Sequence, residues 1–483
     1  MKRKAWKQFM AAALSAAMAV GLAACGGNAA TGTGATGATS VEESSAAESG
    51  AEESAPPEEE SKYPIRTKAD GSPIDLGGIE VVIGDWWSAD EETEPANAYE
   101  EARVEFYDWA EETYHFTLKQ AAISTWADMP EDFVNYATSG GDEHYIFVLR
   151  QSGELVSAMN SGLMYDLAAL DCLDFSEAKW KSGIHELLSK NGAIYGMRGI
   201  DPEPRTGVFF NKRLLEEAGI APEDLYDKQE NGEWTWDAFE ELCKQVQKDT
   251  DNDGVIDQYA MATQASYFYS AAIYSNNGEY VGKDDTGYFS RLESEETMEA
   301  LNWAYRVRNT YEMVYPADSA WDYSYTAFAN GEAVFCIDDA YNAGGKWSEM
   351  EDDFGFVCFP KGPKASDYTN CYTDNVYAIP ACYDAEKAWN IAFVYDIYTS
   401  PIPGYEDYAA WKSDFYSSFR DTESVDLSLA RMMENGMVTY HSMVAGIDLG
   451  NDFIWSLNED NTPAQQAESI RNTWQAYLDE ANQ

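Results

Sequence analysis

Two adjacent tryptophans, Trp86 and Trp87, directly follow the apolar run 79–84, and Asp85 stands just before them. An indole offers a flat apolar face and a carboxylate accepts hydrogen bonds, so this group suits a ligand with apolar C–H faces and a rim of hydroxyls. Two neighbouring tryptophans are hard to bury in one core, which favours at least one of them at a binding surface. The alternative is that they belong to the core.

A second group of oxygen-bearing side chains lies in one polar loop. Four aspartates recur there at alternating positions: Asp249, Asp251, Asp253 and Asp257. With Gly254 between the last two, the spacing is typical of the first part of an EF-hand-type Ca²⁺ loop. Ala260 occupies the place of the usual bidentate Glu, so another carboxylate would have to complete the site. We expect a structural Ca²⁺ here and no cofactor that the function requires; the alternative is a tight turn shaped by Asx hydrogen bonds.

Signatures of catalysis are absent from the sequence. It contains no P-loop, GxSxG or HExxH motif and no Cys/His cluster with zinc-site spacing. Asp338 and Asp339 are paired carboxylates, but adjacent residues on an extended segment point to opposite faces and make a poor acid/base pair. We therefore expect a binding protein and not an enzyme, with a surface glycoside hydrolase as the least favoured alternative.

The charge balance excludes several classes of partner. The 483 residues include 85 acidic and 32 basic side chains, a formal net charge of −53. Such a surface argues against nucleic acid and against adhesion to anionic lipid. Aromatic residues make up 14% of the chain, more than a core needs, which suggests aromatics in a cleft. Apart from Cys25, the cysteines are expected to be mostly buried thiols, with a bridge between Cys371 and Cys382 left open.

The N-terminus has the pattern of a targeting segment. A basic run over 2–7 precedes an apolar stretch over 9–22, and the sequence LAACG at 22–26 resembles a bacterial lipobox. It implies a signal peptide over 1–24 and lipidation of Cys25, with ordinary secretion as the alternative. Residues 25–62 hold almost no large apolar side chains, so we expect a disordered tether. The expected location is the extracellular face of the cytoplasmic membrane, with the lipid as the only membrane attachment.

Strand and helix patterns alternate through the remaining chain. They predict strands over 79–84, 115–120, 145–149, 207–210, 333–337 and 354–359. They predict helices over 95–112, 128–138, 182–190, 212–218, 236–248, 294–310, 385–399 and 464–480. Buried apolar strands separated by helices imply βαβ units and a parallel sheet, hence an α/β fold.

Several segments together resemble the extracellular solute-binding protein family 1, the maltose-binding-protein-like group. In family order they are NGAIYGM at 191–197, VFFNKRLLEEAGI at 208–220, WTWDAF at 234–239, FANGEAVF at 328–335 and FGFVCFPKGP at 354–363. The resemblance spans most of residues 77–480. The sequence departs from the family where Arg198 replaces a frequent Pro and where 199–204 lengthens the first crossing between lobes.

The resemblance implies a two-lobed periplasmic-binding-protein-like fold with a hinge and an interlobe ligand cleft. Lobe 1 would comprise 77–198 plus 372–412, and lobe 2 would comprise 205–365 plus 415–483. It further implies an oligosaccharide ligand and delivery to the permease subunits of an ABC importer, and we expect a monomer. The alternative is a receptor for a non-sugar solute such as a peptide, a polyamine or a metal complex.

The family resemblance and the loop positions also suggest ligand contacts beyond Trp86 and Trp87. The further expected ligand-binding residues are Arg150, Tyr267, Tyr269, Trp321, Asp322, Asp338, Tyr341, Asp374, Asn375 and Trp455. At each aromatic position the alternative is a core side chain, and for Arg150 it is a surface or lobe-bridging salt link.

Overall fold

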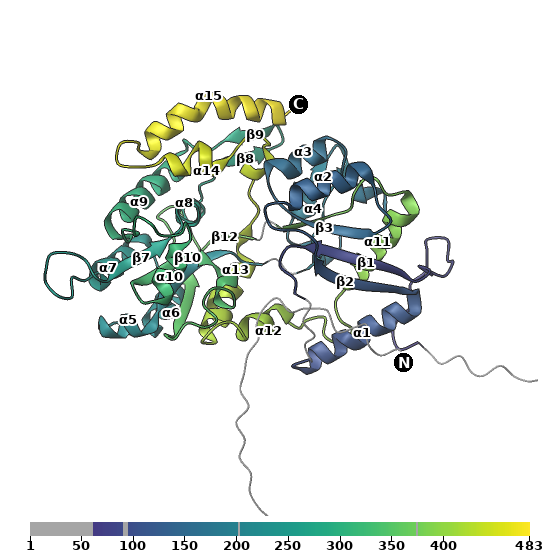
Figure 1. Ribbon diagram of the computed structural model, residues 1–483, viewed down its shortest axis with the longest axis horizontal. Helices are drawn as coiled ribbons and strands as arrows, with labels where there is room; N and C mark the ends of the chain where they lie inside the picture. Colours follow the sequence, from purple (N-terminus) through teal and green to yellow (C-terminus); the bar gives the residue numbers. More distant parts are fainter. Residues whose placement is uncertain (1–60, 90–94, 201–202, 373–374) are drawn as a thin grey trace, which may run out of the picture. The chain divides into compact units, whose positions relative to one another are not determined.

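Two four-stranded sheets carry the fold in the computed structural model, which describes residues 61–89, 95–200, 203–372 and 375–483 (Figure 1). The predicted signal peptide, Cys25 and the tether as far as residue 60 lie outside the described residues. Residues 67–483, as far as they are described, belong to one compact unit. Within the described ranges, no helix is both long and apolar enough to cross a bilayer.

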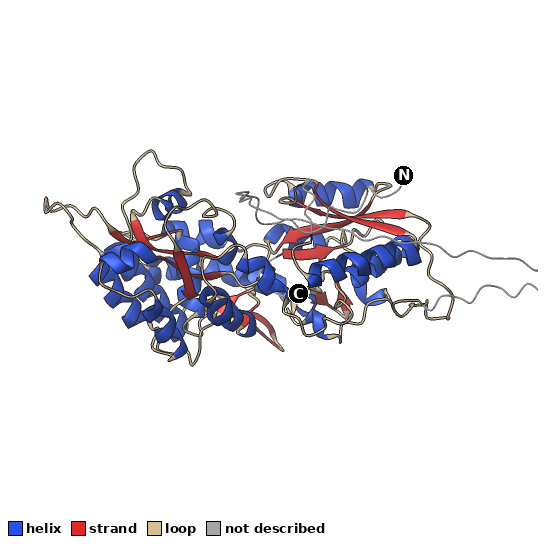
Figure 2. Ribbon diagram, turned by 90° about the horizontal axis from the view of Figure 1, so that it is seen from below, coloured by secondary structure: helices blue, strands red, loops and turns tan. Residues whose placement is uncertain are grey.

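The first sheet has the strand order β13–β3–β1–β2. β1 (Ile79–Asp85) pairs in parallel with both β2 (Phe116–Ala122) and β3 (His144–Arg150), while β13 (Asn375–Ala378) joins β3 antiparallel. The three strands expected in the N-terminal part are thus present and parallel. Helices lie on both faces of this sheet (Figure 2), which explains why the centres of β1 and β3 are apolar, whereas the edge strand β2 has Lys119 at its centre.

Five helices belong to this part, called lobe 1 below: α1 (Ala98–Tyr114), α2 (Met129–Ser139), α3 (Gly153–Asn160), α4 (Ile184–Leu187) and α11 (Ala385–Tyr398). Three of them, α1, α3 and α11, begin at side-chain caps. Asn97 caps α1 by accepting from the N–H of Glu100, and Ser152 caps α3 in the same way. The helix expected over 182–190 is limited to α4, because the chain turns at Asn191-Gly192, both at positive φ, into the hairpin β4 (Ser189–Lys190) and β5 (Ala193–Ile194).

The second sheet, which defines lobe 2, has the order β11–β6–β10–β7. β6 (Thr206–Asn211) is antiparallel to β10 (Ala333–Asp339) and to β11 (Phe354–Cys358), whereas β7 (Tyr259–Thr263) is parallel to β10. The sheet is therefore mixed, and the parallel arrangement predicted from the alternation holds only for part of it. The reason is that β6 starts at the edge where β10 and β11 end, since Thr206 pairs with Asp339 and Gly207 with Cys358.

Helices and two small two-stranded sheets surround the second sheet. The helices are α5 (Lys212–Glu217), α6 (Glu223–Glu230), α7 (Trp236–Val246), α8 (Ala265–Tyr274), α9 (Glu295–Tyr311), α10 (Tyr323–Ala329), α12 (Ala410–Tyr416), α13 (Ala430–Glu434), α14 (Leu449–Asp452) and α15 (Pro463–Ala481). One small sheet is the hairpin of β8 (Val281–Asp284) and β9 (Gly287–Ser290), and the other pairs β12 (Asn370–Cys371) in parallel with the distant β14 (Gly436–Met437). Every residue of β10 is buried, so both faces of this sheet are covered.

Each lobe has its own hydrophobic core, and the segments that build one core are not consecutive in the sequence. Met443, near the C-terminal end, is buried in the lobe 1 core beside residues such as Phe147 and Leu155. Two of the crossings between the lobes lie next to each other, because Met197 bridges to Tyr377 and Pro204 bridges to Tyr372. The lobe 1 core therefore draws on segments from three distant parts of the sequence.

Candidate functional site

A cavity of about 1270 Å³ is lined by residues from both lobes and from the crossings. Its wall is rich in aromatic side chains: Trp86, Trp87, Tyr99, Tyr107, Trp126, Tyr267, Tyr274, Tyr341, Tyr372, Tyr398, Tyr405, Tyr408, Trp411 and Phe415. The branched aliphatic residues among the described lining residues are Ile200 and Ile402 alone. The carboxyl ends of β1 and β10 lie at this wall, as expected for ligand sites in α/β folds.

The paired tryptophans owe their position to Asp85 at the end of β1. The buried Asp85 carboxylate accepts from the backbone N–H groups of Trp87 (3.0 Å) and Ser88 (2.9 Å) and from the amide of Gln120 (2.6 Å). These bonds fix the loop that follows the strand. The rings of Trp86 and Trp87 meet edge to face at 4.9 Å, with Trp86 packed partly against the lobe 1 core.

A third indole reaches the cavity from the loop after β2. Trp126 is 58% exposed, and the guanidinium of Arg150, at the end of β3, lies 3.8 Å from the centre of its ring. Arg150 also donates from Nη1 to the backbone carbonyl of Trp126 at 2.7 Å. The loops after β1 and β2 are joined by a hydrogen bond from the N–H of Ile123 to the carbonyl of Asp85.

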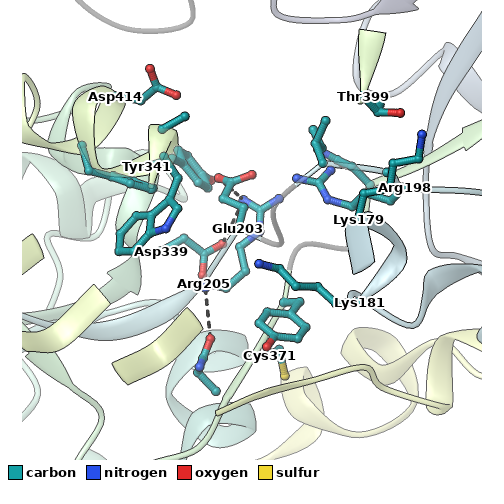
Figure 3. Close-up of a pocket in the computed structure, with 18 of the residues that line it drawn as sticks. Lys179, Lys181, Arg198, Glu203, Arg205, Asp339, Tyr341, Cys371, Thr399 and Asp414 are labelled. Atoms are coloured by element: carbon teal, nitrogen blue, oxygen red, sulfur yellow. Dashed lines mark hydrogen bonds and ion pairs between the residues drawn. The ribbon is translucent and has the colours of Figure 1, made fainter. Parts of the chain in front are cut away.

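Charged side chains from the first crossing stand in the middle of the cavity. Figure 3 shows Arg205 between Glu203 and Asp339, and its guanidinium lies 3.6 Å and 3.8 Å from their carboxylates. Asp339 also accepts from the hydroxyl of Thr206 at 2.8 Å. Arg205 lies 5.2 Å from the ring centre of Tyr341, so one arginine organises both an acidic and an aromatic wall residue.

On the lobe 1 side, the cavity wall is basic. Lys179, Lys181 and Arg198 lie apart from Tyr341 and Asp339 in Figure 3. Lys179 forms an ion pair with Asp396 of α11 at 2.5 Å, and the two side chains are 6% and 2% exposed. Lys179 also donates to the backbone carbonyl of Asp396 at 3.2 Å, so this pair ties the wall to the lobe 1 framework.

Tyr267 and Tyr341 both line the cavity, next to two buried carboxylates. Burial raises the pKa of Tyr341 to about 12, and the nearby Asp339 adds to this shift. Burial, followed by repulsion from Asp339, raises the pKa of Asp338 well above its usual value. Asp338 accepts from the amide of Asn342 at 2.6 Å and from the N–H of Asp339 at 2.7 Å. Both tyrosines therefore stay neutral at physiological pH and offer hydroxyls for hydrogen bonding.

A separate group of tyrosines closes another part of the wall. Tyr99, at the start of α1, stacks on Tyr408 at 4.8 Å and meets Tyr405 edge to face at 5.6 Å. Tyr405 and Tyr408 belong to the irregular segment before α12. None of the three was expected at the site from the sequence, because nothing in an isolated helix end or a polar loop distinguishes a cleft tyrosine from a surface one.

The structure brings five of the expected contact residues to the cavity: Trp86, Trp87, Tyr267, Tyr341 and Asn375. Six others, although described, do not line it: Arg150, Tyr269, Trp321, Asp322, Asp338 and Trp455. Asp374 lies outside the described residues.

The six residues away from the wall have other surroundings. Tyr269 is 2% exposed in the lobe 2 core, beneath Arg308. Trp321 and Trp455 are 82% and 57% exposed on the surface, and Asp322 pairs with Lys346 at 3.6 Å.

The aspartate loop brings three of its four carboxylates together. One oxygen each from Asp249, Asp251 and Asp257 lie within 4.8 Å of one another. Backbone groups already engage these side chains, since Asp249 accepts from the N–H of Gly254 and Asp257 from that of Thr250. Asp253 instead accepts from the N–H of Val255. The donor set suits Ca²⁺ in its chemistry.

No disulfide joins Cys371 to Cys382, so the bridge left open from the sequence does not form. Cys243, Cys336, Cys358 and Cys382 are free thiols. Cys336 and Cys358 lie on β10 and β11, which β6 separates in the sheet.

Comparisons with known proteins give the family. The sequence model of the bacterial extracellular solute-binding proteins matches residues 147–393, slightly more than half of the chain. No curated protein matches it in sequence.

Solved structures show the same fold. UgpB of Mycobacterium tuberculosis in complex with glycerophosphocholine has a TM-score of 0.57 at 16% identity, covering 79% of this chain and 95% of that one. The cyclic alpha-maltosyl-1,6-maltose binding protein of Arthrobacter globiformis has a TM-score of 0.56 at 14% identity, covering 84% of this chain and 98% of that one. Maltose-bound MalE3 of T. maritima has a TM-score of 0.53 at 16% identity, covering 83% of this chain and 99% of that one. The two-lobed α/β fold expected from the sequence is confirmed, and the chain belongs to the bacterial extracellular solute-binding proteins.

Proposed function

We propose that this protein is a receptor that binds an oligosaccharide in its cavity and delivers it to an ABC importer. The single observation that carries the proposal is the composition of the wall, where fourteen aromatic side chains stand against two branched aliphatic ones. An aliphatic wall would suit acyl chains or apolar peptides. Flat aromatic faces suit the C–H faces of sugar rings, and the interspersed Ser, Thr, Asn and Gln side chains suit their hydroxyls.

The volume of the cavity supports a ligand of more than one sugar ring. At about 1270 Å³ it exceeds the roughly 300–1,000 Å³ of a typical small-molecule site. Its aromatic residues come from many elements: the loops after β1, β2 and β10, the helices α1, α8, α11 and α12, the second crossing and the segment before α12. Several rings of a chain-like ligand can therefore meet an aromatic face at once. Two of the similar structures contain or are named for maltose-type sugars, which is consistent with this proposal.

A second candidate ligand is a zwitterionic solute. The wall carries Arg103, Lys179, Lys181, Arg198 and Arg205, and also Glu203, Asp339, Glu406 and Asp414. Charges of both signs within one cavity suit a ligand that has both an anionic and a cationic group. The similar UgpB structure contains glycerophosphocholine, which has this character.

A thermal-shift panel separates these candidates. The purified protein is heated with maltotetraose, cellotetraose, xylotetraose, glycerophosphocholine, trialanine or spermidine. A ligand that binds only the folded state stabilises it by about 2.7 kcal/mol at a hundredfold excess over its Kd. We expect a concentration-dependent rise with at least one tetrasaccharide and no cleavage products on prolonged incubation. A rise with glycerophosphocholine, trialanine or spermidine alone would overturn the oligosaccharide proposal.

We further propose that Cys25 anchors the mature protein to the membrane and that the protein acts as a monomer. The support for the anchor is the sequence pattern LAACG after a basic and an apolar segment. Mass spectrometry of the N-terminal peptide should show lipid on Cys25, and C25A should be released from cells. Light scattering at the monomer mass, 53.8 kDa for the whole chain, tests the oligomeric state.

A further inference from the structure

Trp126 has an unusual environment for an indole. It lies in the loop after β2, lines the cavity and leaves 58% of its surface exposed. A large apolar side chain at a loop tip gains little from such a position unless something else covers it. A tryptophan that faces a ligand cavity while remaining exposed is therefore a candidate contact surface.

Arg150, which contacts this indole, is anchored in the sheet of lobe 1. Its backbone belongs to β3, which pairs with β1 on one side and with β13 on the other. The guanidinium stacks on the ring at 3.8 Å, and Nη1 donates to the carbonyl of Trp126 itself at 2.7 Å. One group thus fixes both the ring and the backbone of the same residue, which a flexible lysine ammonium cannot do.

We infer that Trp126 is a stacking platform for a saccharide ring and that Arg150 is the positioning residue that holds it. The inference rests on the proposed oligosaccharide function. Arg150 covers one face of the indole, and the exposed remainder is left for the ligand. Restricting the ring before binding lowers the entropy that the ligand must offset. The loop after β1, which carries Trp86 and Trp87, is hydrogen-bonded to the loop of Trp126, and all three indoles line the cavity.

The positioning role is tested without any ligand. The protein is labelled with 5-fluorotryptophan, and the Trp126 resonance is assigned as the one lost in W126F. We expect a resonance shifted from the value of free fluorotryptophan in the wild type, and a move toward that value in R150A with R150K in between. R471A, which breaks an exposed ion pair with Glu293 elsewhere, serves as the matched control. A Trp126 resonance that is the same in wild type and R150A overturns the positioning role.

The platform role is tested with maltotetraose, cellotetraose and xylotetraose. We expect W126A to weaken binding of the best of these probes about five- to tenfold, as loss of a stacked aromatic typically does. R150A alone should weaken binding of the same probe about threefold. In the W126A background, R150A should weaken binding less than about 1.5-fold, because Arg150 acts through Trp126. W126F should recover part of the loss, while W455A, which removes an exposed indole away from the cavity, should change nothing.

The outcomes separate this inference from the proposed function. If one probe binds and W126A has no effect, the platform is overturned while the receptor function stands. If Arg150 and Trp126 contribute additively, Arg150 contacts the ligand itself and the positioning role fails. If no probe shifts either the Trp126 resonance or the melting temperature, the oligosaccharide function and the platform fail together.

Discussion

The buried pair of Lys179 and Asp396 should be the most sensitive charge interaction of lobe 1. The side chains are 6% and 2% exposed, and the nitrogen lies 2.5 Å from the carboxylate. The variant K179M keeps most of the side-chain volume but removes the positive charge. Breaking a buried ion pair from one side typically costs about 3–5 kcal/mol, because the remaining charge stays desolvated.

K179M should therefore lower the free energy of unfolding by about 3–5 kcal/mol at pH 7. Urea denaturation followed by circular dichroism measures this loss.

Two variants give the reference points. K364M breaks the pair of Lys364 with Glu295, which has a similar distance of 2.6 Å but side chains that are 39% and 77% exposed, so we expect a loss below about 1 kcal/mol. K179M/D396N removes both charges and should recover at least half of the loss at pH 7. The reasoning is refuted if K179M is as stable as wild type at pH 7, or if its loss is no larger than that of K364M.

Three further predictions concern the site and its surroundings. Burial lowers the pKa of His441 to about 4, so its contribution to stability should be complete above pH 6.5 and fall by about 3 kcal/mol as the pH drops to 4, with a smaller fall in H441Q. Equal urea profiles for the two proteins would contradict this. If the aspartate loop binds Ca²⁺, adding Ca²⁺ at about 1–10 mM, on the order of the dissociation constants of weak extracellular sites, should raise the melting temperature of the wild type. The same addition should not change the melting temperature of D251N/D257N. If the wild type shows no rise, the loop is a polar turn without a bound ion. W87A should weaken tetrasaccharide binding about tenfold in calorimetry without lowering the melting temperature, and unchanged affinity would remove Trp87 from the contact set.

The main strands and helices could be predicted because burial leaves a clear pattern. The apolar run 79–84 became β1, and the expected strand 333–337 became β10, because a strand covered on both faces must be apolar throughout. Helix α7 begins where Thr235 caps it, as the threonine before an apolar-periodic segment indicates. Strand direction in the second sheet could not be predicted, because the apolar pattern is the same for either direction.

The site was harder to predict because neighbours in sequence point in different directions. Tyr267 and Tyr269 are two residues apart on α8, so they lie on different faces of the helix, one lining the cavity and the other in the core. Asp338 and Asp339 end one strand, and only Asp339 reaches the cavity. Trp126 gave a usable signal, since it follows the second strand as Trp86 follows the first.

The burial of Met443 in the lobe 1 core has a consequence for how the chain folds. The first strand of that lobe starts at Ile79. The core of the lobe is complete only when Met443, more than three hundred positions later, has packed into it. Contacts that link such distant parts of a chain slow folding, because the intervening loop must close first. Lobe 1 therefore cannot finish folding while the chain is still emerging, and a fragment that ends before Met443 should expose apolar surface and aggregate.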